Sequence, residues 1–282
     1  MDGAVLRKID EITAILKQTV EGKCAIALAG AHAKGVADAA SDLDIYIFAE
    51  KEKPQSVREA LIASIADAGT TPWVCASFAD FPWGGGMDFR YQGTPVEVVG
   101  RSISGMEESI ADCLEGKFQI IPEIWTSNGY YTYIHLCELS FLKPVWDPDG
   151  ILAKWQEKAK VYPPALRRSI LETFLGRASM WLDNFHYDSA ISRGDLLFAA
   201  PIALHTVMDM VQVIFALNSR YYTGDKKLEK ALAELPVCPK ELLRNLEFLL
   251  TASHDPRKLG RQREILRSVW AELNQKAKAF LV

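Results

Sequence analysis

Several features that would place this chain in a specialised class are scarce. Its five cysteines are odd in number, widely spaced and contain no C-x-x-C, so neither a disulfide framework nor a zinc site is indicated. We expect them to be reduced, mostly buried thiols. The formal net charge is only −4, without an evident basic stripe, which argues against a nucleic-acid partner. The composition, 49% hydrophobic and 24% charged over 282 residues, is that of a globular protein.

Long hydrophobic runs are scarce as well. Residues 1–18 carry charges at helical spacing and lack the apolar core of a signal peptide. The most apolar later segment, residues 202–217, is sixteen residues long and includes His205, Asp209 and Gln212, so it is too short and too polar to span a bilayer. The sequence therefore predicts a cytoplasmic protein without a membrane partner. It gives no indication of the oligomeric state.

Hydrophobic periodicity divides the chain into two regions. The first hundred residues combine two helical patterns, one ending at Gly22 and one over 55–69, with short runs of branched and aromatic residues. From residue 104 onward, almost every segment has helical periodicity. The expected strands are 24–29, 43–49, 71–78, 87–92 and 94–100, and the expected helices of the second region are 104–116, 131–142, 164–185, 189–218, 228–235, 240–252 and 261–280.

These patterns predict an α+β protein. We expect a mixed-sheet domain over residues 1–122 and an all-α helical bundle domain over residues 123–282. The boundary is placed near Pro122, Asn128 and Gly129, which interrupt the helical pattern. The sequence contains no internal repeat and no low-complexity tract.

Two Asp-x-Asp pairs occur, and their surroundings differ. Asp147 and Asp149 lie in WDPDG, where proline and glycine indicate a turn, so we interpret them as turn or helix-cap residues. Asp42 and Asp44 instead begin the expected strand 43–49, where residues two apart project from the same face. Two adjacent carboxylates are costly unless a cation lies between them, and oxygen ligands at this spacing suit Mg²⁺. The alternative is a strand-end pair that is simply solvated.

The loop before this pair, GAHAKG, favours the metal interpretation. Gly30 follows a strand and allows a sharp turn that exposes backbone amides, and Gly35 ends the loop. Amides presented in this way bind phosphate. Val36-Ala37 follows where a P-loop would have Lys-Ser or Lys-Thr, so the loop is not a Walker motif.

A third carboxylate, Glu97, lies in the expected strand 94–100. Val96 and Val98 occupy the opposite face of that strand. If this strand pairs with 43–49, three carboxylates converge, and they can hold two divalent ions, or one ion beside a general base, for displacement at phosphorus. An exposed strand glutamate is the alternative.

Together these residues resemble a known family. Gly30, then Ser41-Asp42-Leu43-Asp44 eleven residues later, then a strand with Glu97, is similar to the core of the DNA polymerase β-like nucleotidyltransferases. The segment GAHAKGVADAASDLDIYIF looks most like the bacterial branch that includes the aminoglycoside and lincosamide antibiotic nucleotidyltransferases. One position departs from the pattern: Ala31 stands where the family usually has a serine. The loss of one neutral hydrogen bond costs only about 0.5–1.5 kcal/mol, so activity can survive it.

The resemblance implies a mixed-sheet nucleotidyltransferase core with one or two Mg²⁺ ions at Asp42 and Asp44. It also implies transfer of a nucleoside monophosphate from a triphosphate, expected to be ATP, to a hydroxyl, with release of pyrophosphate. Glu97 would complete the metal site or take the proton of the acceptor. Gly30 would hold the triphosphate through its backbone, and its neighbours in the motif would also take part in nucleotide binding: Ala31, Lys34 and Ser41.

Candidates outside the motif are less specific. In residues 216–228, donors and an aromatic face gather at a helix end, where a base or phosphate tail of the nucleotide can bind; they are Asn218, Arg220, Tyr221 and Lys226. A helix cap followed by a turn explains them about as well. Trp73, Trp83 and Tyr91 either form an aromatic wall of the site or belong to the core, which is the more usual place for aromatics near a sheet.

We therefore expect a metal-dependent nucleotidyltransferase acting on a small hydroxylated acceptor, of which an aminoglycoside- or lincosamide-like antibiotic is one example. One alternative is a nucleotide-binding regulatory or interaction protein with weak or no transferase activity, which Ala31 favours. Another is a transferase acting on a protein or tRNA end, and the acidic chain argues against tRNA. The sequence identifies neither the acceptor nor the preferred nucleotide.

Overall fold

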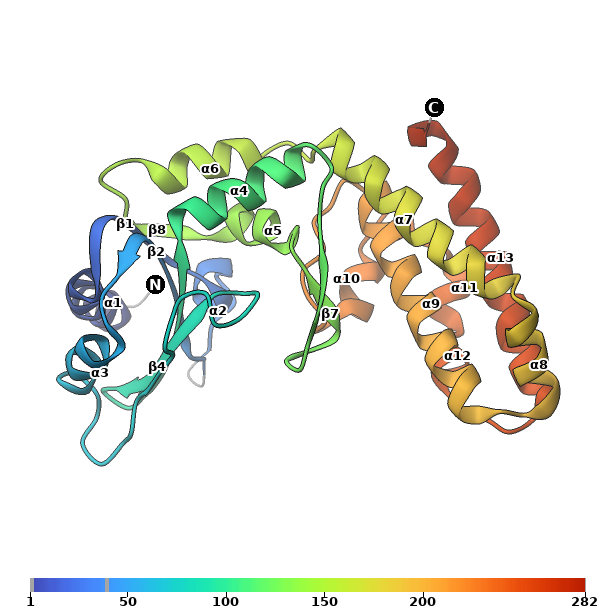
Figure 1. Cartoon of the computed structure of the whole chain (residues 1–282), viewed down its shortest axis with the longest axis horizontal. Coiled ribbons are helices and arrows are strands. Elements are labelled where there is room, and N and C mark those ends of the chain that lie inside the picture. The colour runs from blue at the N-terminus through green and yellow to red at the C-terminus, as the bar shows by residue number, and fades with distance from the viewer. Residues whose placement is uncertain (1–2, 39–40, 282) are drawn as a thin grey trace. The chain divides into compact units, whose positions relative to one another are not determined.

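The structure, a computed structural model, describes residues 3–38 and 41–281. The chain forms two compact units (Figure 1). The first contains residues up to 112, 119–123 and 130–161, and the second contains 113–118, 124–129 and 162 onward. The expected boundary at residue 122 does not coincide with the division between these units, because residues 130–161 pack with the first unit.

The first unit is built on a six-stranded mixed sheet with the strand order β3-β4-β5-β2-β1-β8. The pair β2–β5 is parallel, and the other neighbouring pairs are antiparallel. The α+β class predicted from the sequence is confirmed, and the central strands fall where the alternation placed them. The strands are β1 (Val20–Leu28), β2 (Leu43–Glu52), β3 (Trp73–Val74), β4 (Gly85–Tyr91), β5 (Thr94–Ser102) and β8 (Lys143–Trp146).

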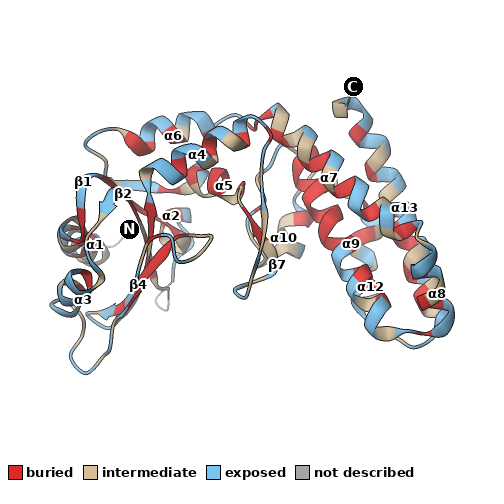
Figure 2. Ribbon diagram, viewed as in Figure 1, coloured by how far each residue is buried: buried red, intermediate tan, exposed pale blue. Residues whose placement is uncertain are grey.

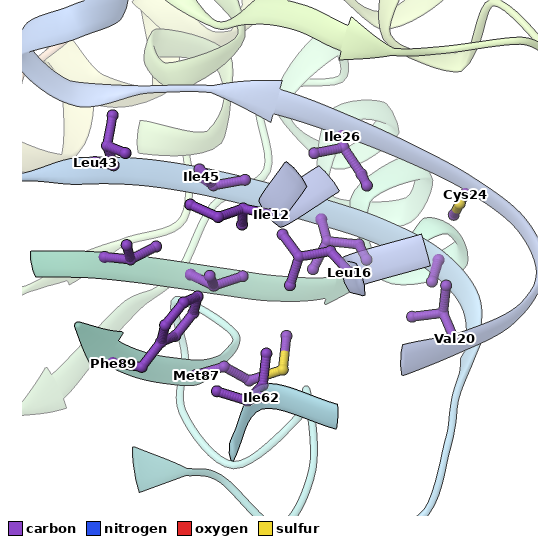
Figure 3. Packing of buried hydrophobic residues seen from close by; sticks show 14 of the residues in the cluster. Ile12, Leu16, Val20, Cys24, Ile26, Leu43, Ile45, Ile62, Met87 and Phe89 are labelled. Atoms are coloured by element: carbon purple, nitrogen blue, oxygen red, sulfur yellow. The ribbon is translucent and has the colours of Figure 1, made fainter. Parts of the chain in front are cut away.

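One face of this sheet forms the hydrophobic core of the unit (Figure 3). Strand residues such as Leu43, Ile45 and Met87 are buried there, because alternate side chains of each strand project to this face. They pack against Ile12 of helix α1 (Gly3–Leu16) and Ile62 of helix α3 (Gln55–Ala63). A short 3₁₀ helix (Lys17–Thr19) follows α1. Burial on this face fixes the register of the strands, and therefore also fixes which residues project from the other face.

The other face is covered over part of its area by α4 (Ile103–Leu114), α5 (Ile134–Phe141) and α6 (Ile151–Ala159). Trp155 of α6 packs edge-on against Phe48 of β2 at 5.3 Å between ring centroids. A buried ion pair joins β5 to α5: Arg101 Nη1 lies 2.5 Å from Glu138 Oε2, and Arg101 Nη2 lies 3.2 Å from Glu138 Oε1. The Tyr46 hydroxyl of β2 donates to Glu138 Oε1 at 2.8 Å, so one carboxylate ties two neighbouring strands to a helix.

Loss of this carboxylate charge is expected to destabilise the first unit. Burial disfavours the charge of Arg101, but the charge and hydrogen bonds of Glu138, together with the neighbouring Tyr130 and Tyr46, outweigh that cost and raise the pKa of Arg101. Replacing Glu138→Gln leaves a buried, unpaired guanidinium, so we expect the free energy of unfolding to fall by about 3 kcal/mol or more. Urea unfolding measures the loss. Glu21→Gln, which breaks the exposed Lys51–Glu21 pair, is the control and should cost less than about 1 kcal/mol; equal losses would contradict the assignment.

Some local elements differ from those expected. The strand expected over 71–78 is limited to β3, because the amide of Phe78 and the hydroxyl of Ser77 hydrogen-bond the Glu52 carboxylate and the chain leaves the sheet. Three further strands lie in the region expected to be helical: β8, and a hairpin of β6 (Ile120–Glu123) and β7 (Thr126–Tyr131). Helix α6 was not expected either. Strands of four to six residues are too short for periodicity to reveal.

The second unit is helical, as predicted for the second half of the chain. The helix expected over 189–218 is divided at Gly194, which has a φ of 65° and contacts the backbone of His254, and Asp195 then caps the next helix by accepting from Phe198 N at 3.3 Å. The helices are α7 (Pro164–Leu182), α8 (Phe185–Arg193), α9 (Leu196–Leu217), α10 (Leu228–Ala233), α11 (Lys240–Arg244), α12 (Leu246–Leu250) and α13 (Pro256–Leu281).

Helix α9 is the most apolar element of the chain. It is 22 residues long, six more than the segment picked out by hydropathy, and by length and composition alone it could cross a bilayer. Two thirds of its most apolar 18-residue window, 67%, is buried within the protein, as in the central helix of a soluble bundle (Figure 2). Its hydrophobicity is therefore explained by packing against α7 and α13.

Asp209 of α9 is expected to make stability depend on pH. Its side chain is 5% exposed, with Arg177 Nη2 at 3.3 Å, and burial outweighs the attraction of that arginine and raises the pKa of Asp209 to about 7. Between the unfolded pKa near 4 and the folded pKa near 7, the native state holds a proton that the unfolded chain has lost, so stability falls as pH rises.

Asp209→Asn removes this titration. Relative to the native protein, the variant should gain about 3 kcal/mol in the free energy of unfolding between pH 5 and pH 8. Urea unfolding of both proteins at the two pH values measures the change. A difference between them that is the same at pH 5 and pH 8 would show that Asp209 does not titrate as described.

Candidate functional site

Three carboxylates converge at one edge of the sheet in the first unit. Asp44 of β2 and Glu97 of β5 are partners in the parallel register, and Asp42 lies two residues before Asp44. One carboxylate oxygen from each of the three residues lies within 4.8 Å of the others. The predicted convergence of Asp42, Asp44 and Glu97 is thus confirmed, and it follows from the pairing of two strands far apart in the sequence.

Such a cluster can bind a divalent cation. Three like charges at this spacing repel one another, and an ion among them removes the repulsion. All the donors are carboxylate oxygens, the hard ligands that Mg²⁺ and Mn²⁺ prefer. Asp42 and Asp44 are half-buried and Glu97 is exposed, so a ligand can reach the cluster from the side of Glu97.

Gly30 is required by the geometry of Asp44. The Ala29 amide donates to the Asp44 carbonyl at 2.8 Å, which brings the end of β1 beside the start of β2. Gly30 follows with a φ of 55°, and a Cβ placed on it would overlap Oδ2 and Cγ of Asp44. The sequence suggested that this glycine exposes backbone amides; the structure adds that only a residue without a side chain allows the Asp44 carboxylate to occupy its position.

The expected phosphate loop contains a short helix. Helix α2 (Gly30–Lys34) begins at the glycine that contacts Asp44 and is followed by the capping residue Gly35, which has a φ of 72°. The first amides of any helix lack partners within the helix, so the backbone at Gly30 and Ala31 has the character that the sequence predicted for phosphate binding. The side chain of Ala31 is only a methyl group, so it adds no hydrogen-bonding group to this backbone.

Two other predicted nucleotide-binding residues already have partners within the protein. The Lys34 ammonium lies 4.2 Å from the centre of the Phe141 ring, on α5. The Ser41 hydroxyl donates to Asp38 Oδ1 at 3.1 Å and accepts from the Asp38 amide at 2.9 Å, which closes the loop before β2. These contacts give both residues a structural role, and their nucleotide contacts stay predictions.

The second unit contains the remaining predicted nucleotide-binding residues. The Asn218 side chain donates to the carbonyls of Ile214 and Val237 at 2.7 and 2.8 Å and accepts from the Val237 amide at 2.9 Å, so the helix-end alternative accounts for it. Tyr221 stacks on Tyr162 at 4.9 Å between ring centroids. Arg220 and Lys226 are exposed. The role of these four residues in nucleotide binding stays a prediction.

The second Asp-x-Asp pair behaves as its surroundings predicted. Asp147 accepts hydrogen bonds from the amides of Ile151 and Ala153 at 2.7 and 3.1 Å, and so caps the start of α6. The Asp149 carbonyl accepts from Lys154 at 3.3 Å. The same dipeptide spacing thus serves a turn in one place and an acidic cluster in the other.

Sequence reasoning missed a fourth carboxylate, Asp88 of β4. Asp88 is the antiparallel partner of Glu97, so Asp44, Glu97 and Asp88 form a row across three strands on the same face. Its side chain is exposed, yet desolvation by the surrounding strands and the negative charge of Glu97 raise its pKa to about 6. The signal was present in the sequence: Asp88 and Glu97 lie at equal distances from the Gln92-Gly93 turn, which sets the register of the hairpin.

Aromatic side chains continue this row. Trp73 of β3 is the register partner of Asp88 and is 47% exposed. Phe81 and Trp83, in the connection between β3 and β4, stack with ring centroids 4.6 Å apart, and Phe81 lies 6.3 Å from Trp73. The wall alternative considered for Trp73 and Trp83 is therefore the one that their positions favour. Tyr91 instead hydrogen-bonds Glu11 of α1 and packs against the core.

Comparisons with known proteins support the fold, and they provide less information about the activity. Residues 137–228, about a third of the chain, match the family described as a domain of unknown function (DUF4037). A search of the curated proteins found no match to the sequence. Among solved structures, the chain is similar to a nucleotidyltransferase-like protein from Exiguobacterium sibiricum 255-15, with a TM-score of 0.51, 8% identity, and coverage of 98% of this chain and 78% of that one. At this identity the likeness shows a shared nucleotidyltransferase-like fold.

Proposed function

We propose that this protein is a metal-dependent nucleotidyltransferase that moves a nucleoside monophosphate from a nucleoside triphosphate, ATP by preference, to a hydroxyl of a small molecule. The observation that carries the proposal is the convergence of Asp42, Asp44 and Glu97 within 4.8 Å beside the first residue of α2. The nucleotidyltransferase-like fold supports it, because the likeness to the similar solved structure extends over 98% of this chain.

The residues divide the reaction between them. Asp42 and Asp44 would hold one or two Mg²⁺ ions, which when bound would offset the charge of the triphosphate and polarise the α-phosphorus. The backbone at Gly30 and Ala31 would bind and orient the phosphate tail. Glu97 would complete the metal site or accept the proton of the acceptor hydroxyl. The acceptor oxygen forms a bond to the α-phosphorus, the bond from that phosphorus to the bridging oxygen breaks, and pyrophosphate leaves.

The alternative of a nucleotide-binding regulatory protein rests on Ala31. A serine at this position would add a hydroxyl to the phosphate contacts, and its absence removes one neutral hydrogen bond. The backbone amides do not depend on that side chain, so binding and turnover can both persist. A small acceptor, such as an aminoglycoside- or lincosamide-like antibiotic, is proposed from the family resemblance alone. The cytoplasmic location is likewise a proposal.

Pyrophosphate release tests the proposal. The native protein is incubated with Mg²⁺, each of the four common triphosphates in turn, and a panel of hydroxylated small molecules, and pyrophosphate is measured by a coupled assay. Transferase activity predicts release that needs both Mg²⁺ and an acceptor and that disappears in Asp42→Ala and Asp44→Ala. Triphosphate binding without turnover across the panel would favour the regulatory alternative.

A further inference from the structure

One row of side chains crosses β2, β5, β4 and β3 on the same face of the sheet. It consists of carboxylates on β2, β5 and β4 and of an aromatic ring on β3. Asp44, Glu97, Asp88 and Trp73 are successive register partners on neighbouring strands. Residues paired in register project to the same face, so these four side chains share it. The phosphate-binding candidates, Gly30 and Ala31, follow β1, which lies on the β2 side of this row. The β4 and β3 side is therefore the part of the row left for another molecule.

Trp73 is held as a platform. A Cβ on Gly86 would overlap the six-membered part of the Trp73 ring, so the ring lies against the backbone of β4 where a side chain is missing. Nearly half of the residue, 47%, is nevertheless exposed. With the half-buried Phe81 and Trp83 beside it, Trp73 forms a partly exposed aromatic patch next to carboxylates, an arrangement that is typical of a ligand contact.

The neighbouring aromatic pair is also anchored. Phe81 and Trp83 are stacked with an angle of 2° between their rings, and the Trp83 carbonyl accepts a hydrogen bond from Arg101 Nε. Arg101 is in turn held by Glu138 at 2.5 Å. The connection that bears these rings is thus fixed to the buried network of the unit, which limits the entropy lost when a ligand binds.

The chemistry of this surface defines its ligand. An ionised carboxylate only accepts hydrogen bonds, so a group bound to Asp88 must donate, as a hydroxyl does. Flat apolar ring faces, including the C–H faces of saturated rings, pack on aromatic side chains. Four carboxylates in and beside the row, namely Asp42, Asp44, Glu97 and Asp88, repel an anionic compound.

We infer that Trp73 and Asp88 form the acceptor subsite of the proposed transferase, and that the acceptor is a hydroxylated ring compound without negative charge that stacks on Trp73 and donates a hydroxyl hydrogen bond to Asp88. The inference rests on the proposed function, because it names the substrate class of the same site. Asp88 lies between Trp73 and Glu97 in the row, so an acceptor held by Trp73 and Asp88 would present its hydroxyl-bearing edge toward Glu97, the residue proposed to meet the reacting hydroxyl.

Ligand-observed saturation-transfer NMR tests this inference without metal or turnover. The probes are the methyl pyranosides of glucose, galactose and mannose, with glucose 6-phosphate as the charged control and sorbitol as the acyclic control. We expect transfer to the ring protons of at least one methyl pyranoside and none to the two controls. Trp73→Ala and Asp88→Asn should each reduce the signal at least fivefold. Trp125→Ala, which removes a 74% exposed tryptophan from the β6–β7 hairpin, should leave it unchanged.

Trp73→Phe is the control for misfolding. It keeps a smaller aromatic ring and should therefore retain part of the saturation-transfer signal. Binding of Mg²⁺ and a non-hydrolysable ATP analogue should be the same in Trp73→Ala and Asp88→Asn as in the native protein. The inference is overturned if no methyl pyranoside binds, if Trp73→Ala binds as the native protein does, or if Trp73→Ala loses the nucleotide, because Trp73 would then stack on the base. Failure of the proposed function appears separately, as metal and nucleotide binding that does not depend on Asp42 and Asp44.

Discussion

Asp44→Asn is expected to lower Mg²⁺-dependent pyrophosphate release by about a thousandfold or more, which is ~4 kcal/mol of transition-state stabilisation. Asparagine has nearly the shape of aspartate, so it fits the space beside Gly30. What it removes is the negative charge that would hold the cation beside Asp42 and Glu97. Initial rates at saturating triphosphate measure the effect, and urea unfolding checks that the variant is folded.

The second Asp-x-Asp pair supplies the matched control. Asp149→Asn makes the same chemical change in the same dipeptide spacing, at a turn before α6, and should leave the rate within about twofold of the native value. A native rate in Asp44→Asn would remove this carboxylate from the mechanism. An equal loss in both variants would indicate a general effect of the lost charge.

Gly30→Ala is expected to have a smaller but still large effect, for a steric reason. The new Cβ would overlap the Asp44 carboxylate, so either the side chain leaves the acidic cluster or β1 and β2 separate at this end. We expect pyrophosphate release to fall by about a hundredfold or more, because an error near 1 Å in the position of a reacting group has effects of this order. Rates and metal binding by the folded variant measure it.

Gly35→Ala separates collision from backbone strain. Gly35 also has a positive φ, 72° against 55° at Gly30, but a Cβ on it meets nothing within 4 Å. Both alanines carry the cost of a left-handed conformation, about 1 kcal/mol, and only Gly30→Ala displaces Asp44. Similar activity losses in the two variants would mean that strain in the loop is responsible, and contact with Asp44 would then not explain Gly30.

The sequence predicted the features that depend on periodicity and motif spacing, namely the face shared by Asp44 and Glu97 and the turn at WDPDG. Alternation along β2 and β5 identified which face Asp44 and Glu97 share, and their pairing followed once the two strands were taken as neighbours. The turn at WDPDG separated the capping aspartates from the acidic cluster. In each case a few adjacent residues contain the information.

The features that were missed depend on contacts between distant segments. β8 forms a strand because it pairs with the edge of β1, and a segment of four residues is too short to predict that pairing. The buried network of Arg101, Glu138 and Tyr46 joins three elements, and no single segment shows it. The Asn218 side chain bridges a helix end to Val237, a contact between two segments that the residues around Asn218 do not show by themselves. Asp88 is the exception, because its pairing with Glu97 lies within one hairpin and could have been predicted by counting residues from the turn at Gly93.

Nucleotide binding at the acidic cluster should depend on a divalent metal ion held by Asp42 and Asp44. Equilibrium dialysis measures Mn²⁺ and a non-hydrolysable ATP analogue retained by the native protein and by the double variant Asp42→Asn/Asp44→Asn. We expect the native protein to retain both together, and the double variant to lose the metal-dependent part of nucleotide binding. Retention by the double variant equal to that of the native protein would contradict this dependence.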